Sequence, residues 1–320
     1  MCKAVFPVHV KVSLGIFYNC IASLSLVYNF SCIVVIFVKK VRFHSEISTH
    51  IIRNQFIFDF CVVANLMIIL NDKYENLDIP LLNGIRCYLW SSQFPYWAMV
   101  CVSINNLVDN CLDRLIAVRW ASSYKATMKT RMKIYYGLLF TLPLFVSFSV
   151  IVDMKYLPDQ NICIDRNQNA TNEYLTFQRF YSSFWFCFTF GIPLMISIFS
   201  FIMIHNIMKK TTQNNVGMSM RKSEIRYTVV TFVTLIIFAL TYGIESILYF
   251  LKSFYLICYE KNDPLQNLIT TLGSVSSMAN PFILNTMLKS LRSSWMMFWC
   301  NPLGKKYCPT AVRPSTSTTL

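Results

Sequence analysis

Seven long stretches of apolar residues constrain this chain more than any other feature. Five contain no Asp, Glu, Lys or Arg, and the other two contain one acid each, Asp59 and Glu245. Roughly 20 apolar residues in a helix cross the hydrocarbon core of a bilayer. The stretches are 12–38, 54–71, 87–108, 134–152, 180–208, 227–251 and 264–288. Because a backbone in lipid must satisfy its own hydrogen bonds and no alternating strand pattern is present, we predict an all-α membrane protein, a seven-transmembrane helix bundle.

The basic residues predict the orientation of this bundle. Only 14% of the residues are charged, against about 25% in soluble domains, and the net charge is +14. With the N-terminus outside, most of the 29 Lys and Arg fall in cytoplasmic segments. We therefore expect a multi-pass plasma-membrane protein with a cytoplasmic C-terminus and a basic face toward anionic membrane lipid. Nucleic-acid binding explains the charge less well, because no basic soluble domain is present.

The segments outside the helices are short. We expect an extracellular N-terminus over 1–12, the seven-helix domain over 13–288, an amphipathic juxtamembrane helix over 289–300 and a disordered cytoplasmic tail over 301–320. Cys300 is a candidate for acylation, with an unmodified thiol as the alternative. Asn169 begins a glycosylation sequon in a predicted outer loop, which agrees with this orientation.

Short polar motifs follow one another along the stretches in a fixed order. They are Asn29, Asn54-Gln55-Phe56-Ile57-Phe58-Asp59, Asp113-Arg114-Leu115, Pro193 and Asn280-Pro281-Phe282-Ile283-Leu284. In order and spacing they resemble the helix-one Asn, Asn-Leu-Ala-x-x-Asp, Asp-Arg-Tyr, the helix-five Pro and Asn-Pro-x-x-Tyr of rhodopsin-like (class A) G-protein-coupled receptors. The resemblance covers essentially the whole chain. It implies a receptor, not an enzyme, that binds an extracellular ligand and activates a heterotrimeric G protein.

The chain departs from this family pattern at several positions. Where helix six of the family has a Trp and a kinking Pro, this chain has Tyr242 and Ile244, and Leu284 replaces the Tyr of Asn-Pro-x-x-Tyr. No tryptophan is evident at the helix-four position of the family. Cys87 lies slightly further before Arg114 than the family spacing. These differences predict a divergent member of the family.

The resemblance implies a conformational switch at Asp113 and Arg114. Asp113 would hold the Arg114 guanidinium at rest, and Glu224 falls where the family can have an acid that joins helix six to helix three. Ligand binding would then release Arg114, helix six would move outward and a G protein would enter. The alternative is an Asp–Arg pair that merely reaches cytoplasmic water. The expected hinge positions are Pro193, Tyr242 and Pro281.

Asp59 is a lone carboxylate in the middle of an apolar stretch. The resemblance surrounds it with polar side chains that can hold a sodium ion, whose charge would compensate the acid; these are Asn29, Ser103, Ser276 and Asn280. The alternative is a protonated Asp59 that bonds to Asn29 and Asn280 without an ion. We expect no other cofactor and no metal site, because the four His are scattered along the chain.

The resemblance also implies a disulfide between Cys87 and Cys163, which would join the top of helix three to the second outer loop. Cys2 and Cys258 also fall outside the membrane in the predicted topology, and a second disulfide could join them. Free thiols are the alternative for both pairs.

The ligand pocket is expected among side chains at the outer ends of the helices, which are Gln93, Tyr96, Trp97, Tyr242, Glu245 and Tyr249. An acid among aromatic rings suits a cationic group, such as an amine or a peptide arginine. A peptide is the leading ligand class, and a small molecule sensed by a chemosensory receptor is the alternative. Glu245 could instead reach outer water or pair with a Lys. Ser274 stands where opsins carry the retinal lysine, so a light receptor is not expected.

A transporter or channel is the main rival class. Such proteins usually show internal repeats and interrupted helices around a mid-membrane site, and the sequence shows neither. An enzyme is not expected, because the chain has no Gly-x-Ser-x-Gly pattern and no clustered His. The Ser- and Thr-rich tail at 315–319 suits phosphorylation and arrestin docking.

Overall fold

The structure is a computed structural model that describes residues 8–43, 45–71, 79–165, 172–212, 218–257 and 264–300. Within these ranges, the side chains of 8–12, 149, 165, 210–212, 218–226 and 300 are not described. Nearly all of the described residues are helical, and the strands among them form one short hairpin.

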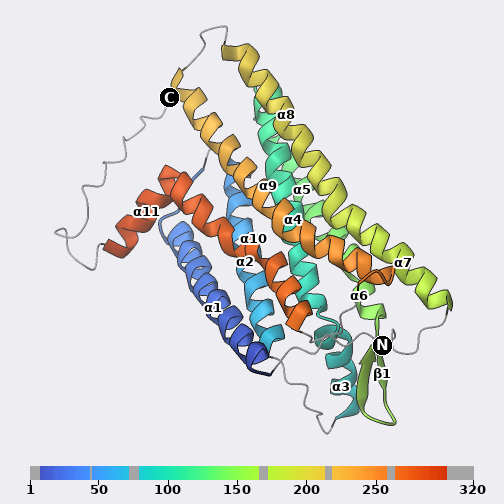
Figure 1. Cartoon of the computed structure of the whole chain (residues 1–320). Coiled ribbons are helices and arrows are strands. Elements are labelled where there is room, and N and C mark those ends of the chain that lie inside the picture. Colours follow the sequence, from blue (N-terminus) through green and yellow to red (C-terminus); the bar gives the residue numbers. More distant parts are fainter. Residues whose placement is uncertain are drawn as a thin grey trace.

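Long helices packed side by side form the body of the molecule (Figure 1). They are α1 (Val8–Val38), α2 (Glu46–Asn71), α4 (Phe94–Arg119), α5 (Met128–Ser147), α7 (Asn172–Phe186) continued by α8 (Ile192–Thr212), α9 (Met218–Ser253) and α10 (Pro264–Met287). Each corresponds to one predicted apolar stretch, with α7 and α8 sharing the fifth. The prediction of an all-α membrane bundle is confirmed.

Short elements complete one end of this bundle. They are α3 (Pro80–Arg86), the π-helical turn η1 (Cys87–Ser91), α6 (Ser149–Val152) and the strands β1 (Met154–Leu157) and β2 (Ile162–Asp165). The two strands are antiparallel, with Met154 opposite Asp165 and Leu157 opposite Ile162. This hairpin lies beside α3 at the lower end in Figure 1, and β1 contacts both η1 and α6.

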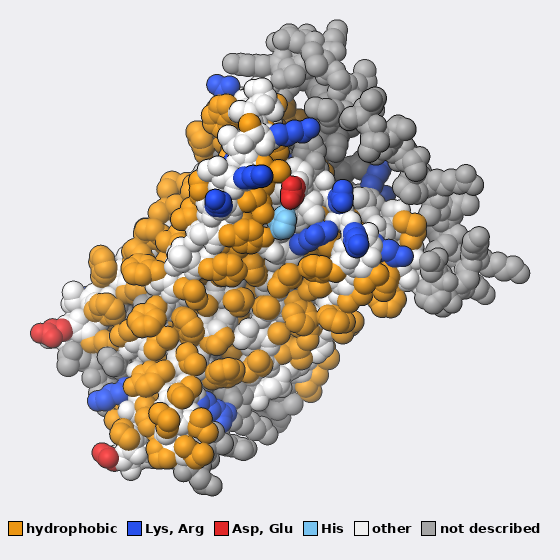
Figure 2. All heavy atoms as spheres, turned by 180° about the vertical axis from the view of Figure 1, so that it is seen from behind, with side chains coloured by type: hydrophobic (Ala, Val, Ile, Leu, Met, Phe, Trp, Pro, Cys, Tyr) orange, Lys and Arg blue, Asp and Glu red, His pale blue; other side chains and the backbone are white. Residues whose placement is uncertain are grey.

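The outside of the bundle is apolar. Within the described residues, five helical segments are long and apolar enough to cross a membrane by length and composition. Large apolar side chains such as Leu24, Phe145 and Met195 are exposed on these helices. Figure 2 shows hydrophobic side chains over most of one face, with Lys and Arg gathered toward the upper end. The middle of the molecule therefore suits lipid and one end suits a charged interface.

α4 and α10 carry many buried polar side chains and lie inside the bundle. α4 contacts α2, α5, α8 and α9, and α10 contacts α1, α2 and α9. Polar side chains of α10 such as Thr270, Ser274 and Asn280 are buried. They face neighbouring helices rather than lipid, where unpaired polar groups are costly.

The third long helix begins later than the apolar stretch 87–108 suggests. α4 begins at Phe94, after the separate turn η1. Between them Gln93 has φ 62°, a left-handed conformation that is uncommon outside glycine. Pro95 follows in the first turn of α4, where a missing backbone N–H costs nothing. This break takes up the additional spacing between Cys87 and Arg114.

The fifth helical column contains a second π-helical turn, η3 (Cys187–Gly191), directly before Pro193. Proline cannot donate a hydrogen bond to the preceding turn, and a π-helical turn accommodates that loss. Opposite η3, α9 comes very close: a Cβ added to Gly243 would lie 2.8 Å from the Phe190 ring. α9 itself runs without interruption through Tyr242, and α10 continues through Pro281.

α11 (Lys289–Cys300) occupies the residues predicted to form an amphipathic helix, and it contacts α1 and α10. Leu291 is buried against the end of α1, and Trp295 Nε1 donates to Ser31 Oγ of α1 at 2.9 Å. Met296 and Trp299 are exposed. α1 begins at Val8, so helix already occupies the last part of the predicted 1–12 N-terminal segment.

Candidate functional site

Arg114 is buried in α4, with only 1% of its surface exposed. Its Nη2 donates to Asp113 Oδ2 at 2.6 Å and also to Ser48 Oγ of α2. A buried charge is costly unless a partner compensates it, and the adjacent carboxylate does so. The structure thus brings Asp113 and Arg114 together as expected. Because both side chains are almost fully covered, the pair does not reach water as the alternative required.

Arg114 is not the only donor to Asp113 among the described side chains. Its Oδ2 also accepts from Ser48 Oγ at 2.9 Å, while Oδ1 accepts from Tyr124 at 2.7 Å and from Arg131 Nη1 at 3.1 Å. The Arg131 guanidinium lies 4.1 Å from the centre of the Tyr124 ring. Sequence reasoning missed these partners, because nothing in the loop after α4 marks them before the helices are packed.

Tyr124 lies in the loop between α4 and α5, outside the membrane-spanning segments. Burial, and to a smaller extent the negative charge of Asp113, raises the pKa of its hydroxyl above the ordinary value. The hydroxyl is therefore protonated at neutral pH and can donate to Asp113. Its oxygen also lies 2.8 Å from Ser45 Oγ, at the beginning of α2.

α9 approaches Arg114 through Tyr227, whose ring centre is 5.5 Å from the guanidinium carbon. Glu224, the predicted acidic partner, lies one turn earlier in α9, and its side chain is outside the described residues. A small cavity at this level is lined by residues of α4, α8 and α9, including Cys111, Arg114, Ser200 and Thr231. Among the described side chains, Arg114 thus contacts α9 through a cation–π interaction with Tyr227.

Asp59 is completely buried in the centre of the bundle and is surrounded by donors. Gln55 Nε2 and Ser103 Oγ donate to Oδ1 at 2.9 and 2.8 Å, and Asn280 Nδ2 donates to Oδ2 at 3.0 Å. Ser103 and Asn280 were expected here. Gln55 was not expected here, because the family motif has an apolar Leu at this position.

Two other expected neighbours, Asn29 and Ser276, have no hydrogen bond to Asp59 among the described side chains, whereas Ser277 has one. Asn29 Nδ2 donates to the Ser25 carbonyl at 3.1 Å and reaches the Ser277 carbonyl at 3.5 Å. The alternative in which Asn29 bonds directly to Asp59 is therefore wrong, because its amide is directed to these backbone groups. Ser276 lines a small neighbouring cavity together with Gln55, Ser103 and Asn280.

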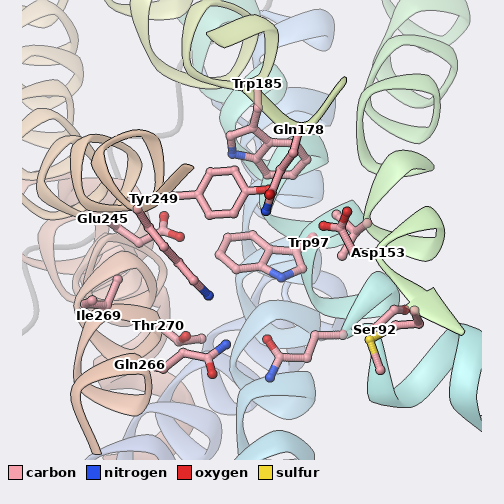
Figure 3. A pocket seen from close by; sticks show the side chains of 14 residues that line it. Ser92, Trp97, Asp153, Gln178, Trp185, Glu245, Tyr249, Gln266, Ile269 and Thr270 are labelled. Carbon is pink, nitrogen blue, oxygen red and sulfur yellow. The ribbon is translucent and has the colours of Figure 1, made fainter. Parts of the chain in front are cut away.

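An open cavity lies at the other end of the bundle, between α4, α7, α9, α10 and the hairpin. Its empty volume, which includes space open to solvent, is about 790 Å³. Figure 3 shows Trp97, Trp185, Tyr249 and Glu245 around its centre. The Trp97 and Trp185 rings meet edge to face at 5.6 Å. The predicted residues Gln93, Trp97, Glu245 and Tyr249 all line this cavity.

Glu245 is the unusual residue of this cavity. It is 3% exposed, and its Oε2 has no hydrogen-bond partner. Behind the carboxylate lies Gly273 of α10, where an added Cβ would be 3.1 Å from Oε2. Lys252 lines the same cavity, but no ion pair joins it to Glu245 in the described part of the chain. A buried carboxylate without a partner is unfavourable, and a cationic ligand would relieve it.

Tyr96 and Tyr242 do not line the cavity, contrary to the expectation. Both are about 1% exposed in the core below it. The Tyr96 hydroxyl donates to the Thr270 carbonyl at 3.0 Å and lies 2.8 Å from Ser274 Oγ, so α10 holds the ring inward. Tyr242 stacks on Phe238 one turn away along α9, with 5.5 Å between ring centres. Trp185 and Gln178 of α7 line the cavity instead.

The disulfide between Cys87 and Cys163 is present and joins η1 to β2, as the resemblance implied. It fixes the hairpin beside the cavity, and Met154 of β1 lines the cavity wall. Other predicted positions lie outside the described residues, namely Cys2, Asn169 and Cys258, together with the side chain of Cys300.

The family model of the 7 transmembrane receptor (rhodopsin family) matches residues 29–284. No curated protein shows significant similarity to the chain. The matched range runs from α1 into α10 and includes the Asp59 cluster, the Asp113–Arg114 pair and the lining residue Glu245. The chain therefore belongs to the rhodopsin family: it is a multi-pass plasma-membrane receptor that acts through heterotrimeric G proteins, and it is not an enzyme.

Proposed function

We propose that the receptor binds an extracellular peptide through a basic group and that outward movement of helix six, α9, passes the signal to the G protein. The observation that carries the proposal is the buried Glu245 carboxylate, whose Oε2 has no partner at the wall of the open cavity. An arginine or a terminal amine would pair with it. Trp97, Trp185 and Tyr249 would stack on the cation, as aromatic rings commonly do.

The position of α9 supports the proposed movement. This helix carries Glu245 at the cavity and Tyr227 against Arg114. Ligand contact at Glu245 would favour an arrangement in which Tyr227 leaves Arg114 and the inner end of α9 moves outward. Pro193, Tyr242 and Pro281 are the positions where we expect the helices to bend during this change, and Glu224 would add an acidic contact at rest.

The gathering of basic side chains at one end supports a cytoplasmic inner face (Figure 2). On this orientation the N-terminus, the hairpin and the cavity are extracellular, Asn169 is glycosylated, and the C-terminus is cytoplasmic. α11 would lie in the lipid interface with Cys300 as an acylation site. The phosphorylated tail would recruit arrestin.

A compact amine from the environment is the second candidate ligand. The aromatic side chains around Glu245 favour it, because such rings enclose small cations well. A peptide is preferred because the cavity is open at its mouth and is also lined by polar side chains such as Asp153, Gln178 and Gln266, which offer contacts beyond one charged group.

The first prediction concerns Glu245→Gln. Cells that express the receptor with a promiscuous G protein are screened with Arg- and Lys-containing peptides and with amines. For an active cationic ligand, we expect the potency to fall about 100-fold in the variant, because a desolvated charge pair is lost. Potency is measured by G-protein activation at equal surface expression.

The matched control is an uncharged analogue of the same ligand, such as citrulline in place of arginine. It should be weak on the wild type and equally weak on Glu245→Gln, because both lack the charge pair. A full response of the variant to the charged ligand would remove Glu245 from the binding site. Activity only with small amines would select the second candidate.

A further inference from the structure

We infer that the amide of Gln55 takes the place of an exchangeable cation beside Asp59, so that this receptor carries a built-in donor where the family resemblance implied a sodium ion. The inference concerns the centre of the bundle and is independent of the ligand and the G protein. Gln55 Nε2 lies 2.9 Å from Asp59 Oδ1 and 2.7 Å from Ser103 Oγ.

A cation bound between Asp59 and Ser103 would have to contact the same two oxygens. The amide nitrogen occupies that point, within hydrogen-bond distance of both oxygens. Ser103 Oγ in turn donates to Asp59 Oδ1 at 2.8 Å, and Asn280 covers Oδ2 at 3.0 Å. Both carboxylate oxygens are therefore bonded to donors on the protein. A sodium ion requires several oxygen ligands in one shell, and this arrangement does not fit it.

The direction of the Gln55 amide follows from a chain of hydrogen bonds with a fixed start. Asn106 Nδ2 donates to the Ile51 carbonyl at 3.0 Å, and a backbone carbonyl can only accept. The same nitrogen donates to Gln55 Oε1 at 2.7 Å. With its oxygen held by Asn106, the amide of Gln55 must turn its nitrogen toward Asp59.

α5 extends the same chain of hydrogen bonds. Tyr135 of α5 donates to Asn106 Oδ1 at 2.6 Å and accepts from Asn54 Nδ2 at 2.8 Å. Every bond on this path from Asn54 to Gln55 joins two helices, so rotating Gln55 to admit an ion would break several bonds at once. α5 has no tryptophan, and Tyr135 and Tyr136 are polar aromatic residues that join it to α2.

The small cavity next to this cluster agrees with the inference. Gln55, Ser103, Ser276, Ser277 and Asn280 are among the residues that line it, whereas Asp59 is not. The carboxylate is thus screened from the cavity by its own donors. An ion that entered the cavity would meet amide and hydroxyl groups before it met the acid.

The experiment measures the melting temperature of the purified receptor in sodium chloride and in potassium chloride at equal ionic strength. We expect equal values for the wild type. Gln55→Leu restores the apolar residue of the family motif and leaves Asp59 Oδ1 and Ser103 Oγ open. This variant should melt at a higher temperature in sodium than in potassium, because an ion that binds only the folded state stabilises it.

Two controls make the result specific. Asn54→Leu removes an amide one residue away that contacts Tyr135 rather than Asp59, so its melting temperature should fall equally in both salts. Gln55→Leu combined with Asp59→Asn should lose the sodium effect, because the charge that attracts the ion is gone. If Gln55→Leu does not fold, Gln55→Met provides an apolar side chain of similar length and the same comparison.

A wild type that sodium stabilises over potassium overturns the inference, and so does a folded Gln55→Leu or Gln55→Met receptor that remains indifferent to sodium. Broadening of the sodium-23 magnetic resonance line gives a direct second measurement. The broadening should be absent with the wild type and present with Gln55→Leu. The opposite pattern would show that the Gln55 amide does not take the place of the ion.

Discussion

Asp113 accepts four hydrogen bonds, and this number determines how firmly Arg114 is held. Two of the donors, Tyr124 and Arg131, come from the loop after α4 and from α5, so the resting contact involves more than the two helices of the expected switch. A hydrogen bond to a charged group contributes about 1.5–3 kcal/mol when it is buried. Weakening the cluster should therefore shift the receptor toward the state in which Arg114 is free.

Tyr124→Phe tests this at a single atom. The change removes the hydroxyl that donates to Asp113 and keeps the ring that Arg131 stacks on. If the resting state loses about 1.4 kcal/mol, the active fraction rises about tenfold. Ligand-free nucleotide exchange on the G protein is the measurement.

Tyr136→Phe is the matched control, because that hydroxyl contacts His50 outside the Asp113 cluster. It should leave ligand-free activity unchanged. Equal activity of Tyr124→Phe and wild type, at equal surface expression, would show that the loop does not restrain Arg114.

At the scale of helices, close contact between η3 and α9 stands out. Gly243 leaves room for Phe190, and a side chain there would push the two elements apart. The family kink is missing from α9, since Ile244 stands at the proline position, so the packing at Gly243 sets the distance between these helices.

Gly243→Ala should lower the melting temperature by a few degrees, because overpacking costs about 1–3 kcal/mol and outweighs the gain in helix propensity. Phe190→Leu in the same chain should restore part of the loss by freeing space. Gly137→Ala serves as the control, since a Cβ there meets nothing within 4 Å. It should keep or raise the melting temperature. A harmless Gly243→Ala would contradict the described contact.

The sequence predicted the helices well because lipid permits few other structures. It placed Ser103 and Asn280 beside Asp59 through the family motifs. Gln55 and Tyr124 could not be identified, because their roles depend on which side chains of α4 and α5 face α2 after packing. Tyr96 and Tyr242 were placed too far outward for a similar reason: periodicity gives the face of a helix but not the depth at which a cavity ends.

For the whole molecule, the disulfide joins parts of the chain that are 76 residues apart. Closing a loop of this size in the unfolded chain is worth about 4 kcal/mol. Changing both Cys87 and Cys163 to Ser should therefore lower the melting temperature by several degrees and weaken ligand binding, because the hairpin beside the cavity loses its attachment. Cys20→Ser, at an exposed free thiol, is the control and should change neither. Unchanged binding without the disulfide would show that the hairpin holds its place by packing alone.

Because α9 is one continuous helix, it connects the cavity directly to the inner end of the bundle. Glu245 and Tyr227 stand on one rod with no proline between them, separated by about 27 Å at 1.5 Å per residue. Below the expected hinge at Tyr242, the part of α9 that leads to Tyr227 contains no proline and can move as one piece. A small displacement at the cavity would then reach the inner end of the helix through its backbone, without a relay of side chains.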